Sequence, residues 1–171
     1  MTLEQIHRLI LDVPDFPKPG IVFKDITPIL ENSEAFKSLA TLMAEQVSPQ
    51  TTKLVAIESR GFILGAAIAQ HTSAGMVIVR KPGKLPRETV RKTYALEYGQ
   101  DSLEIHKGAL KPGDRVTIVD DVLATGGTAR AVEEMCIAIG AQVVGHLFLM
   151  EIEFLKGRTK LHSPTKSMIQ L

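Results

Sequence analysis

The sequence has one cysteine and no tryptophan, and its 20 basic side chains are nearly balanced by 19 acidic ones. Cys136 alone cannot form a disulfide within the chain, which fits a reducing compartment. A net charge of +1 gives no overall attraction to nucleic acid or to a membrane, so neither partner is expected. No apolar run approaches the ~18 residues of a spanning helix, and Glu4 and Arg8 interrupt the apolar pattern of the first residues. We therefore expect a cytoplasmic protein without a signal peptide.

The length and composition are sufficient for a single domain. At 171 residues, 44% of them hydrophobic, the chain can bury a core without a disulfide or a metal ion. We expect one domain over 1–171, with an N-terminal arm at 1–32 and a flexible loop and hairpin at 80–99. The five histidines show no metal-ligand spacing, so no metal held directly by the protein is predicted.

Short apolar segments alternate with helical patterns through the middle of the chain. Strands are predicted at 53–58, 75–80, 115–121 and 142–152, with helices at 61–71 and 126–141. Since parallel strands covered on both faces are continuously apolar, this alternation predicts an α/β fold: a central, mostly parallel sheet with helices on both faces. The period of two in 93–99 and 101–106 predicts a hairpin, and 166–171 is a possible last strand.

The region before residue 50 predicts two helices joined by a connector. Prolines and a glycine in 14–20 stop the first helix and predict a stiff, turn-rich segment. Residues 21–30 are expected to be extended as far as Pro28. Ser33 is expected to cap the second helix.

Residues 115–129 (RVTIVDDVLATGGTA) carry the most chemistry, because a buried strand ends in Asp120 and Asp121 and then leads into a helix. Ligands of open parallel sheets bind beyond the carboxyl ends of the strands, and a helix N-terminus favours phosphate. Gly126 and Gly127 allow close approach of the backbone to an anion, and the neighbouring threonines add hydroxyl donors. The two carboxylates repel phosphate but suit sugar hydroxyls or a metal-bound water. We predict a ribose 5-phosphate site made of Asp120, Asp121, Ala124, Thr125, Gly126, Gly127 and Thr128.

Other nucleotide-binding motifs are missing. The sequence has no GxxxxGK[ST], and no GxGxxG follows a strand. An isolated Asp-Asp pair would more often simply end a strand and begin a turn. For the complete run, from the apolar strand through the two acids to ATGGT, we do not favour this simpler interpretation.

The run VDDVLATGGT (119–128) resembles the signature of the type I phosphoribosyltransferases. Five further blocks are similar, in the same order, to the adenine-using members of that family: PDFPKPGIVFKDITPIL (14–30), ESRGF (58–62), RKPGKLP (80–86), YALEYG (94–99) and LKGRTKL (155–161). The resemblance implies transfer of a phosphoribosyl group from phosphoribosyl pyrophosphate to adenine, giving AMP and pyrophosphate. It also implies Mg²⁺, held through substrate and water near Asp120 and Asp121, and a homodimer.

Residues 80–92 hold six basic side chains and one acidic side chain, Glu88. Their prolines and glycine exclude a helix, so a loop or distorted hairpin is expected. A run of charge is usually a solvated face, but this concentration in a balanced chain suits an anion of the size of pyrophosphate. The resemblance implies a mobile loop that covers the substrate, with pyrophosphate bound by Arg80, Lys81 and Lys84.

A second anion site is predicted at 58–61, between a strand and a helix. Arg60 and the backbone of Ser59 and Gly61 can surround an anion, and the resemblance adds Glu58 to this pyrophosphate-binding set. It also implies that the peptide bond between Glu58 and Ser59 can be cis. Without the resemblance, an ordinary turn with an exposed arginine would be the simpler interpretation.

The resemblance implies that Glu97 transfers a proton at the five-membered ring of the purine and that Tyr98 lies near the reacting centre. By pattern alone, a glutamate in this strand would be an outward, solvated residue. Phe23 can stack on a planar base while the backbone of Val22 and Lys24 binds its edge. The alternative for Phe23 is an anchor of the N-terminal arm in the core.

Two other functions stay open at this point. The same fold can use another acceptor, such as xanthine, guanine or orotate, although the PGIVFKDIT and LEYG blocks favour adenine. A non-catalytic regulator can bind the sugar pyrophosphate, but the N-terminal arm is too short for a winged helix. The balanced charge and the presence of Glu97 also favour an enzyme.

Overall fold

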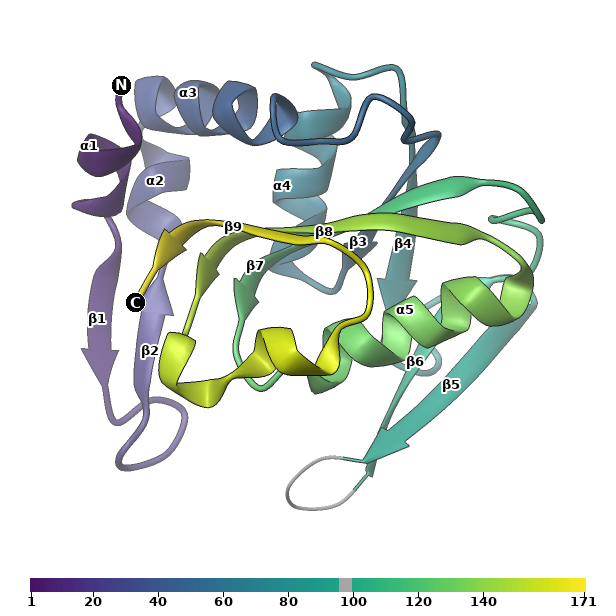
Figure 1. The fold of residues 1–171 in the computed structure, drawn as a ribbon. Coiled ribbons are helices and arrows are strands. Elements are labelled where there is room, and N and C mark those ends of the chain that lie inside the picture. The colour runs from purple at the N-terminus through teal and green to yellow at the C-terminus, as the bar shows by residue number, and fades with distance from the viewer. Residues whose placement is uncertain (96–99) are drawn as a thin grey trace.

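The computed structural model describes residues 1–95 and 100–171. Its centre is a seven-stranded sheet in the order β5-β6-β4-β3-β7-β8-β9 (Figure 1). Five strands run parallel: β3 (Lys53–Ile57), β4 (Gly75–Arg80), β7 (Arg115–Leu123), β8 (Gln142–Glu151) and β9 (Thr165–Gln170). The antiparallel hairpin of β5 (Thr89–Ala95) and β6 (Gln100–His106) joins the sheet beside β4. The predicted α/β fold with a mostly parallel sheet is confirmed.

Helices cover the two faces of this sheet (Figure 1). They are α3 (Ser33–Ala44) and α4 (Arg60–Ala69) on one face and α5 (Gly127–Ile139) on the other. Neighbouring strand residues point to opposite faces, so Leu54 packs with Leu39 and Leu64 while Val55 packs with Val132 and Met135. This alternation explains why the strands are apolar throughout.

The N-terminal arm contains a hairpin that the sequence did not predict. Its elements are α1 (Leu3–His7), β1 (Leu11–Pro14), β2 (Val22–Asp25) and α2 (Thr27–Glu31). β1 and β2 pair antiparallel beside the main sheet, so the predicted connector at 14–20 supplies the last residue of β1 and most of the hairpin loop at 15–21 (Figure 1). The expectation of an extended chain up to Pro28 is wrong, because β2 ends at Asp25. Pro28 instead lies in the first turn of α2, where its missing N–H costs nothing.

The cap of α3 also differs from the expectation. The side chain of Asn32 accepts hydrogen bonds from the N–H groups of Glu34 and Ala35, at 3.1 and 3.0 Å. Ser33 is the first residue of the helix rather than its cap. Asparagine and serine both cap helices well, so with Asn32 and Ser33 adjacent the sequence does not decide which of them is the N-cap.

Two boundaries differ from those predicted. β7 continues two residues further than predicted, to Leu123, because β8 pairs with it there. The last residues of the basic segment, 89–92, belong to β5, so the loop between β4 and β5 is shorter than 80–92. After β8 come two short 3₁₀ turns, η1 (Glu153–Leu155) and η2 (Gly157–Lys160). No helix within 1–95 or 100–171 is long and apolar enough to cross a membrane.

Candidate active site

A cavity of about 340 Å³ lies beyond the carboxyl ends of β3 and β7. All seven residues predicted to bind ribose 5-phosphate line it, together with Glu58, Ser59, Arg60 and Lys81 of the predicted pyrophosphate set. The other members of that set, Gly61, Arg80 and Lys84, and the predicted base-binding residues Val22, Phe23 and Lys24, are not part of this lining. The topology therefore brings two motifs more than fifty residues apart to one cavity, as parallel strands do.

The segment 124–128, which we call the phosphate turn, owes its shape to two glycines. Gly126 has φ +77°, and a Cβ there would lie 2.3 Å from the carbonyl oxygen of Gly157 in η2. A Cβ on Gly157 would lie 2.1 Å from the carbonyl oxygen of Ala124. The N-terminus of α5 has no side-chain cap, so its N–H groups remain available to an anion. Sequence reasoning missed Gly157, although the LKGRTKL block contained it.

Arg60 connects the end of β7 to the N-terminal hairpin. Its Nε donates to Asp121, whose side chain is only 4% exposed, and its guanidinium lies 4.7 Å from the ring centroid of Phe23. Gly61, the next residue, lets the start of α4 lie directly against β7, because a Cβ there would lie 2.9 Å from the carbonyl oxygen of Val119. Arg60 is thus held by the acid and the aromatic ring, and through it Phe23 contacts a residue that lines the cavity.

The two acids differ in their surroundings. Burial, and secondarily the charge of Asp121, raise the pKa of Asp120 well above its usual range. Asp121 has the Arg60 guanidinium as its counterion. Both residues present carboxyl oxygens to the cavity, so Asp120 beside Asp121 can accept hydrogen bonds from the two hydroxyls of a diol.

The remaining predicted pyrophosphate residues form a network at the carboxyl ends of β3 and β4. Glu58 accepts hydrogen bonds from Arg80 Nη2 at 2.9 Å and from the Lys81 N–H at 2.7 Å, and Arg80 also donates to the carbonyl of Lys84 at 3.3 Å. Burial raises the pKa of Glu58, but these bonds outweigh it and lower the pKa overall. The charge of Glu58 would repel an anion, and what its carboxylate does in this structure is hold Arg80 and the backbone of Lys81 in place. The peptide bond from Glu58 to Ser59 is cis.

The hairpin β5–β6 reaches the same cavity. Tyr94 in β5 lies with its hydroxyl 3.3 Å from Thr128 Oγ1 in the phosphate turn. Ala95 pairs with Gln100 across the hairpin. Glu97 and Tyr98, which lie between them in sequence, are outside the residues that the structure describes.

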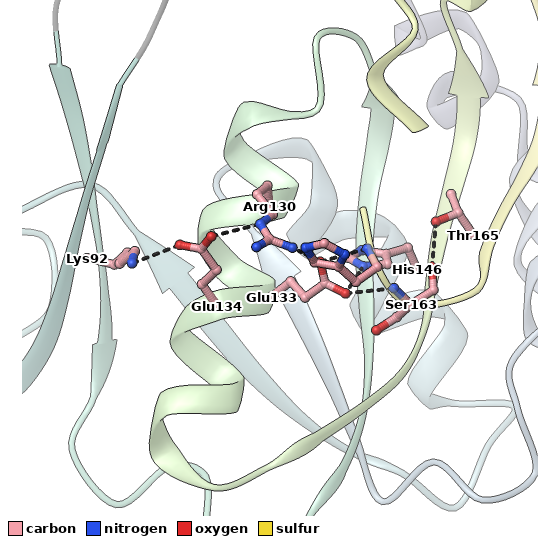
Figure 2. Close-up of polar contacts among 8 residues, drawn as sticks. Lys92, Arg130, Glu133, Glu134, His146, Ser163 and Thr165 are labelled. Atoms are coloured by element: carbon pink, nitrogen blue, oxygen red, sulfur yellow. Dashed lines mark hydrogen bonds and ion pairs between the residues drawn. The ribbon is translucent and has the colours of Figure 1, made fainter. Parts of the chain in front are cut away.

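Helix α5, which begins at the phosphate turn, is held on two sides by a chain of polar contacts (Figure 2). Glu134 pairs with Lys92 of β5 and with Arg130, both at 2.8 Å. Glu133, which is completely buried, accepts the N–H of Ser163 at 2.8 Å and lies 3.4 Å from Arg130. These contacts fix the helix between the hairpin and the segment before β9.

The predicted base-binding residues lie together on β2. Phe23 is half-buried, its ring centroid is 5.2 Å from that of Phe16, and it packs against Arg60. Lys24 Nζ donates to Asp12 at 2.6 Å, across the hairpin. Val22 is exposed. Phe23 therefore contacts a cavity residue rather than anchoring the arm in the core.

The chain is similar to known proteins over nearly its whole length. A family model described as "Phosphoribosyl transferase domain" matches residues 25–166. Adenine phosphoribosyltransferase of Carboxydothermus hydrogenoformans is 55% identical over 157 residues, which are 91% of this chain and 92% of that protein. The corresponding protein of Pelobacter propionicus is 52% identical over 160 residues, 93% of each chain.

Solved structures agree with this result. The crystal structure of adenine phosphoribosyltransferase from Thermoanaerobacter pseudethanolicus superimposes with a TM-score of 0.96 at 48% identity, covering 99% of this chain and 100% of that chain. The Saccharomyces cerevisiae enzyme, solved with an imino-altritol bisphosphate and adenine, has a TM-score of 0.88 at 38% identity, covering 97% of each chain. The chain therefore belongs to the phosphoribosyltransferase family, in which these relatives are adenine phosphoribosyltransferases.

Proposed function

We propose that the protein is a glycosyltransferase of purine salvage: it transfers the 5-phosphoribosyl group of phosphoribosyl pyrophosphate to adenine, giving AMP and pyrophosphate. The observation that supports this best is the cavity itself. It places the backbone N–H groups of the phosphate turn, the two acids near the end of β7 and Lys81 just after β4 around one space. That order matches the 5-phosphate, the ribose hydroxyls and the pyrophosphate of one substrate molecule. The names of the relatives supply adenine as the acceptor.

In the proposed reaction, the bond from the anomeric carbon to pyrophosphate breaks and a ring nitrogen of adenine forms a bond to that carbon. The phosphate turn holds the sugar in place. Arg80, Lys81 and Lys84 take up the negative charge that develops on the leaving pyrophosphate. Glu97 accepts the proton from the five-membered ring of adenine, and Tyr98 lies close to the same centre.

Magnesium is part of the proposal. The carboxylates of Asp120 and Asp121 are hard oxygen donors, which suit Mg²⁺, and they lie in the cavity beside the expected diol. Within the described residues no group of three or more His, Cys, Asp or Glu side chains could hold a metal ion. A bound Mg²⁺ would neutralise pyrophosphate oxygens, held mainly by substrate and water with these two acids nearby.

We also propose that the chain acts as one domain, with the arm at 1–32 contributing to the base site and the basic loop closing over the substrates. Closure would exclude water from the cationic ribosyl centre. The homodimer that the family resemblance implies and the cytoplasmic location expected from the sequence belong to the same proposal.

One assay tests the function. The purified chain is incubated with labelled adenine and phosphoribosyl pyrophosphate, with Mg²⁺ or with a chelator. AMP is expected with the metal and not with the chelator. Turnover of guanine, xanthine or orotate in place of adenine would contradict the acceptor, and binding of the sugar pyrophosphate without turnover would point to a regulator.

The base site gives a separate prediction. Replacing Phe23 with alanine is expected to raise the KM for adenine by about tenfold, because stacking on an aromatic ring is worth ~1–3 kcal/mol per base. The KM for phosphoribosyl pyrophosphate should change little, and steady-state kinetics with each substrate varied in turn measures both. Leu11→Ala is the control, because it removes an exposed apolar side chain from the other strand of the same hairpin. Equal effects on both KM values would contradict a role for Phe23 in base binding.

A further inference from the structure

Lys81 lines the cavity as a proposed pyrophosphate ligand, yet it already has an anionic partner within the protein. Its Nζ pairs with Oδ2 of Asp101, a residue of β6 for which the sequence predicted no role. The Lys81 side chain is 45% exposed and that of Asp101 is 26% exposed. Ion pairs with this much exposure are weak, so Lys81 can exchange its partner for an anion of higher charge.

Asp101 does not depend on Lys81 for its position. Its Oδ2 also accepts a hydrogen bond from the Tyr94 hydroxyl at 3.2 Å, and its Oδ1 accepts the N–H of Ser102 at 2.8 Å. Burial raises the pKa of Asp101, but the bonds from Lys81 and Ser102 outweigh this and lower the pKa overall. When Lys81 leaves, the carboxylate keeps two donors and can stay charged where it is.

The location of Asp101 puts its charge beside the substrate. Tyr94, its cross-strand partner, reaches both the carboxylate and Thr128 of the phosphate turn, at 3.2 and 3.3 Å. Lys81 and Thr128 both line the cavity. Asp101 is thus tied to the cavity through two of its lining residues, and its negative charge opposes that of an anion bound there.

We propose that Asp101 is a positioning residue that competes with pyrophosphate for Lys81. Asp101 holds Lys81 over the cavity before the substrate binds, releases it to the pyrophosphoryl group, and takes it back as pyrophosphate leaves. The step exchanges one ion pair for another and changes no covalent bond. It rests on the proposed function, because it requires that Lys81 bind pyrophosphate. Its consequence is that Asp101 weakens the binding of pyrophosphate and speeds its release.

The test is Asp101→Asn, which keeps the shape and the acceptor oxygen but removes the charge. The Kd of pyrophosphate, measured by calorimetry in the presence of Mg²⁺, is expected to fall about fivefold or more, because a like charge beside a bound anion is removed. The KM for phosphoribosyl pyrophosphate should fall in parallel, while the KM for adenine stays unchanged. Asp101→Glu, which restores the charge, should return both values toward those of the wild type.

Two further variants separate this role from a general change in charge or fold. In a Lys81→Met background, Asp101→Asn should lose most of its effect on pyrophosphate binding, because the ammonium group for which Asp101 and pyrophosphate compete is missing. Glu34→Gln removes the same charge from an exposed carboxylate that pairs with the N-terminal amino group and does not line the cavity, and it should leave the Kd unchanged.

The outcomes are distinguishable. The competition does not exist if Asp101→Asn binds pyrophosphate with the wild-type affinity or more weakly. It also does not exist if Asp101→Asn strengthens pyrophosphate binding as much in the Lys81→Met background as in the wild type. If the wild-type chain binds neither pyrophosphate nor phosphoribosyl pyrophosphate, the proposed function fails and this inference fails with it.

Discussion

Replacing Gly126 with alanine is expected to lower kcat/KM by about a hundredfold or more. The new Cβ would lie 2.3 Å from the carbonyl oxygen of Gly157, and the residue would keep a φ of +77° that costs an L-residue about 1–2 kcal/mol. Since backbone lies on both sides of the contact, the phosphate turn must move by about 1 Å, a displacement that can cost two decades of rate. Steady-state kinetics measures the loss, and it should appear mainly in the KM for phosphoribosyl pyrophosphate.

Gly108→Ala is the control for this experiment. Gly108 has φ +79°, nearly that of Gly126, but a Cβ there would meet nothing within 4 Å. Gly108→Ala should show only the cost of a positive φ at an alanine, without a steric clash. We expect its melting temperature to fall by a few degrees and its kcat/KM to stay normal. If Gly126→Ala behaves like Gly108→Ala, the contact with Gly157 does not shape the phosphate site.

Replacing Glu97 with glutamine is expected to lower kcat by at least about a hundredfold, because a glutamine cannot accept the purine proton and general acid–base catalysis is typically worth ~10²–10⁴. The substitution keeps the size and one acceptor oxygen, so AMP should still bind. The neighbouring Tyr94 and Asp101, which contact cavity residues, show that the hairpin reaches the site. Single-turnover kinetics with saturating substrates would measure the chemical step directly.

The binding measurement is the internal control for Glu97→Gln. An AMP affinity within a few-fold of the wild type shows that the site is intact, so a slow chemical step can be assigned to the lost base. Full turnover by the variant would remove Glu97 from the mechanism. A loss of AMP binding equal to the loss of rate would make it a ligand of the nucleotide instead.

Much of the fold could be predicted because its signals are local. The apolar runs at 53–58 and 115–121 are strands in the structure, and the sheet edge they share follows from parallel pairing. The cavity lining at 120–128 could be predicted because its residues are consecutive: the strand, the two acids and the glycines lie within fifteen positions. That this segment binds a phosphate stays a prediction. The resemblance added the functions of the other blocks and the cis bond at Glu58, which the structure contains.

The missing parts depend on long-range packing. β1 ends in Pro14 and is exposed throughout, so neither burial nor a two-residue period marks it as a strand. Arg60 and Asp121 form an ion pair although they are 61 positions apart in sequence. Gly126 at the start of α5 and Gly157 at the start of η2 also meet only in the folded chain. No local pattern encodes which side chains meet when the elements pack, because that depends on how the whole sheet twists and on what covers its edge.

The meeting of Gly126 and Gly157 also limits how the sequence can change over evolutionary time. A crowded contact between side chains can be relieved by trimming a neighbour, so one substitution can suppress another. Here the atom in the way is a main-chain oxygen, which every amino acid carries. A suppressor would have to reposition an entire backbone segment, so we expect compensating mutations for either glycine to be much rarer than for the buried side chains of the core.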